Sequence, residues 1–122
     1  NQNKDIGTVN MDEIIFMGYG IDDEKYSDYK RKRVKGKNIL IYAGEPMDSD
    51  GNSRITGSST RSAWSEDPLK KLEAAMENGV NAVCPCDDAE YSLFTGLSTG
   101  KQYAMKAYRV QKIGTTALRI YN

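Results

Sequence analysis

The sequence predicts a single α+β domain spanning residues 1–122, and three features lead to this prediction. Short apolar runs rich in β-branched residues, such as Ile14–Met17 and Ile39–Tyr42, are bounded by glycines and indicate buried strands. Between Ser65 and Gly79, apolar residues recur at spacings of three and four, which is typical of an amphipathic helix. Further strand-like runs follow this helix, so strands and helices are mixed in a chain that has the usual size of one compact domain.

The N-terminal part of the chain is predicted to hold strands. Ile6–Val9 indicates a short edge strand that leads into the strand at Ile14–Met17. Gly36 gives the backbone the freedom for a tight turn into the strand Ile39–Tyr42, and Gly44 ends that strand.

A polar loop and then a helix are expected in the middle of the chain. The segment Met47–Ser62 is rich in Gly, Ser, Asp and Thr, which indicates a long loop that we expect to be mobile. After it, Ser65 or Asp67 can cap a helix whose first helical position suits Pro68, and Asn78-Gly79 ends it through a left-handed cap. On this helix we expect Leu69, Leu72, Ala75 and Met76 to face the core, and Lys70, Lys71, Glu73 and Glu77 to face the solvent.

The C-terminal part is predicted to return to strands. Val80–Cys84 indicates a strand, so the order along the chain is strand, helix, strand. Asp87–Phe94 can form a short helix, and Gly96–Gly100 a turn. Gln102–Ile113 and Ala117–Tyr121 have the composition and alternation of two further strands.

Charge and length argue against nucleic-acid and membrane partners. Seventeen basic residues balance seventeen acidic ones, so the chain lacks the broad positive field that nucleic acids or anionic membranes attract. Acidic residues precede the basic run Lys30–Lys37, which we interpret as a solvated connector. No apolar run approaches the ~20 residues that span a bilayer.

Candidate chemistry in the sequence is sparse. There is no histidine, which excludes Ser-His-Asp and Cys-His catalysis and histidine-containing zinc sites. Cys84 and Cys86 lack a second pair for zinc and are interpreted as small residues that close a strand. Residues 48–52 place oxygen ligands at alternate positions, but their glycine comes too early for a calcium loop. The pairs Asp22-Asp23 and Asp87-Asp88 are adjacent in sequence and show no separated acid and base.

Several short motifs resemble those of a known family, namely protease-associated domains. They are Met17-Gly18-Tyr19-Gly20-Ile21, Ser27-Asp28-Tyr29, Val34 to Lys37, Gly44-Glu45-Pro46 and Ala74 to Val83. The set is similar to the version inserted in bacterial zinc aminopeptidases of the glutamate carboxypeptidase/transferrin receptor-like peptidase family. The resemblance implies a swivelling β/β/α domain, with a small curled sheet or open barrel and flanking helices.

The resemblance also implies a function for the whole chain. It implies a non-catalytic accessory domain of a secreted zinc aminopeptidase, which covers the active-site cleft and influences peptide access or partner binding. The chain itself is then expected to be inactive and to hold no cofactor or metal, with zinc in the parent's catalytic domain. Its expected partners are that catalytic domain of the same polypeptide and the peptide substrate. The polar start of the chain fits a piece excised from a longer protein or a mature form after processing, and the family implies a periplasmic or extracellular location.

Four residues are candidates for contact with a substrate or a partner. Arg61 and Trp64 lie where the polar loop meets the helix, and arginine and aromatic residues dominate binding surfaces. Tyr26 and Tyr29 belong to a tyrosine-rich segment and have the same potential. For all three aromatic residues a packing role comes first, because burying a large ring stabilises a small domain, and contact with a partner is the alternative. The alternative function is an independent peptide- or carbohydrate-binding module that uses the tyrosines and Trp64 as a stacking surface; an enzyme in its own right ranks last.

Overall fold

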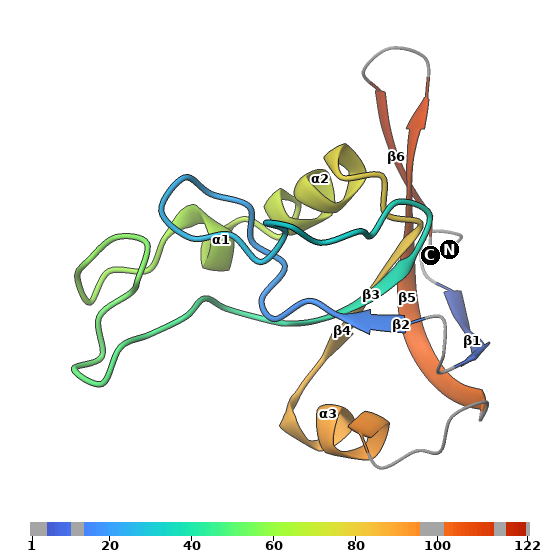
Figure 1. Cartoon of the computed structure of the whole chain (residues 1–122), viewed down its shortest axis with the longest axis horizontal. Coiled ribbons are helices and arrows are strands. Elements are labelled where there is room, and N and C mark those ends of the chain that lie inside the picture. The colour runs from blue at the N-terminus through green and yellow to red at the C-terminus, as the bar shows by residue number, and fades with distance from the viewer. Residues whose placement is uncertain (1–4, 11–13, 96–101, 114–116, 122) are drawn as a thin grey trace.

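A mixed sheet with three helices forms the protein in the computed structural model, which describes residues 5–10, 14–95, 102–113 and 117–121 (Figure 1). The predicted mixture of strands and helices is therefore confirmed. The elements are β1 (Asp5–Asn10), β2 (Ile14–Phe16), β3 (Asn38–Tyr42), α1 (Ala63–Glu66), α2 (Lys70–Glu77), β4 (Ala82–Cys86), α3 (Asp88–Thr95), β5 (Gln102–Ile113) and β6 (Ala117–Tyr121). The turn predicted at 96–100 lies outside the described residues.

The sheet combines a parallel part with an antiparallel part. Strands β2, β3 and β4 are parallel neighbours, with Ile39 opposite Ile15 on one side and Val83 on the other. β5 runs antiparallel to β4, and both β1 and β6 pair antiparallel with β5, so the strand order is β1-β5-β4-β3-β2 with β6 beside β5. The chain between β3 and β4 carries α1 and α2, which supply the crossover that parallel neighbours need.

Helices cover both faces of the sheet (Figure 1). On one face, Ile39 and Val83 pack in a core with Ala75 and Met76 of α2. On the other, Leu40 and the alternate residues of β4, Ala82, Cys84 and Cys86, form a second core against which Tyr91 of α3 packs. Because side chains alternate along a strand, two covered faces produce the continuous apolar runs of the sequence.

The predicted helix is present as α2, which begins two residues after Pro68, and a short helix that was not predicted, α1, precedes it. The Ser62 side chain accepts a hydrogen bond from the Trp64 backbone N–H and starts α1 at Ala63, before the expected cap. Asp67 then has an extended backbone, with φ −103° and ψ 108°, so the helix stops. Because a residue that precedes proline is disfavoured in helical geometry, Pro68 accounts for this interruption. The predicted end is confirmed, since α2 is capped at Asn78 and Gly79 has φ 78°.

Other predicted boundaries agree closely. β5 and β6 have the predicted bounds, and β1, β2, β3 and α3 differ from theirs by a residue at one or both ends. β4 begins and ends two residues later than expected, and its start is displaced because the Val80 backbone N–H still closes the end of α2 on the Ala75 carbonyl. No helix in the described ranges has the length and apolar character that crossing a bilayer requires.

Candidate functional site

A tight backbone turn encloses the carboxylate of Asp28. The backbone N–H groups of Tyr19 and Ile21 each donate to Asp28 Oδ2 at 3.1 Å, and the Tyr26 hydroxyl donates to Oδ1 at 2.8 Å. Gly18 has φ 59°, and a β-carbon there would lie 2.5 Å from Asp28 Oδ1. The Gly-Tyr-Gly-Ile and Ser-Asp-Tyr motifs therefore form one structural unit.

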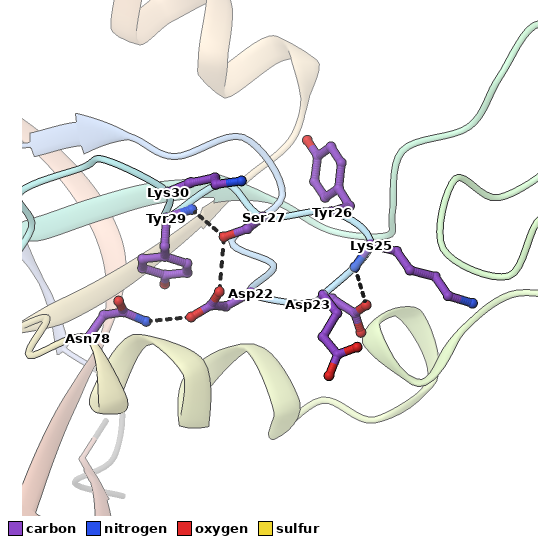
Figure 2. Close-up of a pocket in the computed structure, with 9 residues that line it drawn as sticks. Asp22, Asp23, Lys25, Tyr26, Ser27, Tyr29, Lys30 and Asn78 are labelled. Carbon is purple, nitrogen blue, oxygen red and sulfur yellow. Dashed lines mark hydrogen bonds between the residues drawn. The ribbon is translucent and has the colours of Figure 1, made fainter.

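A polar hollow lies between this unit and the C-terminal end of α2, and we name it the acidic cleft (Figure 2). Its volume is about 430 Å³. Asp22 closes one end, because its carboxylate accepts from Ser27 Oγ at 3.0 Å and from Asn78 Nδ2 at 3.1 Å. The residues that line the cleft are Asp22, Asp23, Glu24, Lys25, Tyr26, Ser27, Tyr29, Lys30 and Asn78.

Trp64 ties α1 to the acidic cleft. Its Nε1 donates to Asp23 Oδ2 at 3.0 Å, and the Lys25 backbone N–H donates to Asp23 Oδ1 at 3.0 Å. These two hydrogen bonds, that from Lys25 first, lower the pKa of Asp23. Lys70 Nζ lies 4.7 Å from the centre of the Trp64 ring. The Trp64 side chain is only 6% exposed. Trp64 is therefore mainly a packing residue.

Tyr29 has a buried hydroxyl without a hydrogen-bond partner. The side chain is 5% exposed, and its hydroxyl is the one buried side-chain polar atom in the described part of the chain that lacks a partner. Burial raises the pKa of Tyr29, and the carboxylates of Asp22 and Asp28 raise it further. A buried polar group without a partner is uncommon in native proteins and costs about 1–3 kcal/mol.

A second hollow, which we name the apolar groove, lies where the C-terminal ends of β3 and β4 meet α1 and α2. It has a volume of about 420 Å³, within the ordinary range of ligand sites, and most of its lining is apolar. Leu69, which the sequence predicts in the core, is 46% exposed here. The lining residues are Ile41, Tyr42, Ala43, Gly44, Trp64, Ser65, Asp67, Pro68, Leu69, Lys71, Leu72, Val83, Pro85 and Tyr108.

Lys71 is the buried charged residue of the apolar groove, which corrects its predicted outward orientation. The side chain is 9% exposed, and Nζ donates to the carbonyl oxygens of Tyr42 at 3.0 Å and Gly44 at 2.5 Å. Burial lowers the pKa of Lys71 to about 8. The helical spacing already contained this information, because Lys71 lies three and four residues before the buried Ala74 and Ala75.

A buried carboxylate organises the polar segment 47–62. Glu45 is 4% exposed and accepts hydrogen bonds from Ser53 Oγ, from the Ser62 backbone N–H at 2.8 Å and from Ser65 Oγ. Although burial raises it, these hydrogen bonds together lower the pKa of Glu45 to about 2. The prediction of a loop is confirmed, and hydrogen bonds from Ser53 and Ser62 fasten the loop to Glu45; its mobility stays a prediction.

The two cysteines are buried and free. Burial raises the pKa of Cys84 to about 12 and that of Cys86 to about 11, so both are protonated thiols at neutral pH. Thiols with a raised pKa are poor nucleophiles. Among the residues that the structure describes, no group of three or more His, Cys, Asp and Glu side chains is arranged to hold a metal ion.

The four predicted contact residues fall in three places. Tyr26 and Tyr29 line the acidic cleft, whereas Trp64 lines the apolar groove and reaches the cleft only through Asp23. Arg61 is exposed on the 47–62 segment, where Nη1 donates to the Ser59 carbonyl at 3.3 Å. Sequence reasoning missed Leu69, Lys71 and Asp28, of which only Lys71 had a signal in the spacing.

Comparison with protein-family models, with curated proteins and with solved structures found no significant match to this chain.

Proposed function

We propose that this chain is a non-catalytic accessory domain of the protease-associated type, part of a larger secreted zinc aminopeptidase. In that enzyme it covers the active-site cleft and influences peptide access, with the zinc and the bond-breaking groups on the catalytic domain. The proposal rests on the family motifs in the sequence and on one structural observation, the apolar groove.

The apolar groove supports a binding role because it combines an exposed anchor with a rigid frame. Leu69 is 46% exposed at its rim, while Ile41 and Val83 of the central strands are buried and fix its floor. A site built on packed strands keeps its shape, so it can select apolar side chains by fit. We propose that the groove receives an apolar side chain of the peptide that approaches the catalytic cleft.

The alternative, an independent peptide-binding module, uses the same groove. A carbohydrate-stacking surface has less support, because Trp64 and Tyr29 are 6% and 5% exposed and do not present open ring faces. The two peptide-binding functions differ in whether a catalytic domain adjoins the chain.

The test uses Leu69→Ser in the parent aminopeptidase, with Leu93→Ser as the matched control. Leu93 is 53% exposed on α3, on the opposite side of the sheet from α2. We expect Leu69→Ser to change the ratio of kcat/KM between long and short apolar peptides by about tenfold, the effect of losing 1–2 kcal/mol of side-chain contact. Both variants should keep the zinc content of the wild-type enzyme, and Leu93→Ser should also keep its kcat/KM ratio. Equal ratios in both variants would contradict the proposed role of the groove.

A further inference from the structure

The Tyr29 hydroxyl marks one end of the acidic cleft as incomplete. It is buried without a partner, although the hydroxyl of Tyr26, three residues earlier in the chain, donates to Asp28. Tyr29 lines the cleft together with Asp22 and Asn78, and Figure 2 shows its ring directed towards the side on which those two residues meet. The missing partner therefore belongs at this end of the cleft.

The charges at this end favour a cation. Asp22 lies beside Tyr29, whose pKa its carboxylate raises. The lysines of the cleft lie elsewhere: in Figure 2 the Lys30 side chain runs along the opposite side of the segment from Asp22 and Asn78, and Lys25 extends away from both. The Asp22 carboxylate would repel an anion bound at this end, and neither lysine of the cleft faces it to offset that repulsion.

The end of α2 adds to this preference. The carbonyl end of a helix carries partial negative charge and attracts cations. The last turn of α2 has no basic residue to compensate it, and its cap residue, Asn78, lines the cleft. The nearby Lys35 lines a different hollow, with Gly36 and Asn81. A metal ion fits less well than an organic cation, because the described residues bring no three ligands of the carboxylate type together here.

We propose that the end of the acidic cleft formed by Asp22, Tyr29 and Asn78 binds a primary ammonium group, as presented by a peptide N-terminus or a lysine side chain. The choice of a peptide as its source rests on the proposed function. An ammonium has three donors, which match the Asp22 carboxylate, the Tyr29 hydroxyl oxygen and the Asn78 amide oxygen. Because the Tyr29 hydroxyl is covered, binding includes a small opening in which the ammonium replaces Asn78 Nδ2 as a donor to Asp22.

The test is an NMR titration of the 122-residue chain with three short peptides. Tri-alanine amide has a free amino group, its N-acetylated form has none, and N-acetyl-Ala-Lys-Ala amide presents only the lysine. We expect amide shifts at Asp22–Tyr29 and Asn78 with a free amine. Whichever of the first and third peptides binds more tightly identifies the source. Equal affinity for the acetylated tri-alanine, or no shift with any of the three at millimolar concentration, would overturn the proposal.

Two variants separate binding from folding. Tyr29→Phe and Asp22→Asn keep the shape of the side chains, and each should weaken amine binding about tenfold. The control is Asp50→Asn, at an exposed residue of the 47–62 segment, which should leave amine binding unchanged. Tyr29→Phe should not lower Tm, because it removes a buried group that has no partner. A lower Tm with unchanged affinity would show that the hydroxyl is purely structural and would contradict the proposal. These readouts do not involve Leu69 or a catalytic domain, so this inference can fail while the proposed function stands, and the reverse.

Discussion

At the scale of single residues, the contact between Gly18 and Asp28 decides the conformation of the N-terminal motif. The carboxylate takes the place of a backbone partner for the turn that follows β2, since it accepts from two backbone N–H groups and one hydroxyl. Charge-assisted bonds of this kind are stronger than neutral ones. The glycine is required both for its positive φ and for the space that Asp28 occupies.

We expect Gly18→Ala to destabilise the protein more than Gly51→Ala does. Both glycines have positive φ, 59° and 83°, but a β-carbon at Gly51 meets no atom within 4 Å. Gly51→Ala should therefore lower the free energy of unfolding by about 1–2 kcal/mol, from backbone strain alone. Gly18→Ala displaces Asp28 as well, which adds about 1–3 kcal/mol for the groups left unbonded. Urea unfolding of both variants measures the difference, and equal losses would show that Asp28 does not fix this turn.

At the scale of elements, Glu45 connects the end of β3 to the polar segment and to α1. Below about pH 5 this connection should weaken. The folded-state pKa of Glu45 is about 2, below the ordinary value of 4.5, so its contribution to stability is full above about pH 5 and is lost as the pH falls towards 2. Lys71, with a pKa of about 8, stays protonated throughout this window. Glu45→Gln should therefore flatten the dependence of the urea midpoint between pH 5 and pH 3.

The control for this prediction is Glu66→Gln, at an exposed residue of α1. It should leave the pH dependence of the wild-type protein in place. A Glu45→Gln protein that loses as much stability as the wild type between pH 5 and pH 3 would show that other carboxylates dominate acid unfolding.

The same elements show how far the sequence determines the structure. Apolar runs and turn glycines predicted β2, β3, β5 and β6, because these signals are local. The start of α2 was also local, because Asp67 and Pro68 mark it, whereas α1, with four residues, is too short to show the helical spacing that the prediction used. The approach of Trp64 to Asp23, 41 positions apart, has no local signal. The cleft and the groove both depend on such distant contacts, so only their aromatic members were predicted.

At the scale of the whole molecule, the decisive property is that both faces of the central strands are covered. Ile39 and Leu40 are neighbours in β3, point to opposite faces and are both 0% exposed. A sheet with one solvated face would tolerate truncation at one of the two positions. Here each should lose about 2–5 kcal/mol of unfolding free energy on change to Ala, as is typical of fully buried aliphatic residues.

Measurement of Ile39→Ala and Leu40→Ala by urea unfolding, with the half-exposed Leu93→Ala as the control, tests this architecture. Leu93 belongs to α3 but points outward, so its truncation should cost well under 1 kcal/mol. Comparable losses at Ile39 and Leu40 mean that α3 closes the second face as firmly as α1 and α2 close the first. The apolar groove and the acidic cleft both lie on the side of α1 and α2, so a firm second face would keep their floor in place in the proposed binding of a peptide. A small loss at Leu40 alone would instead make α3 a loose cover, and the rigid frame on which the proposed selection by fit depends would be absent.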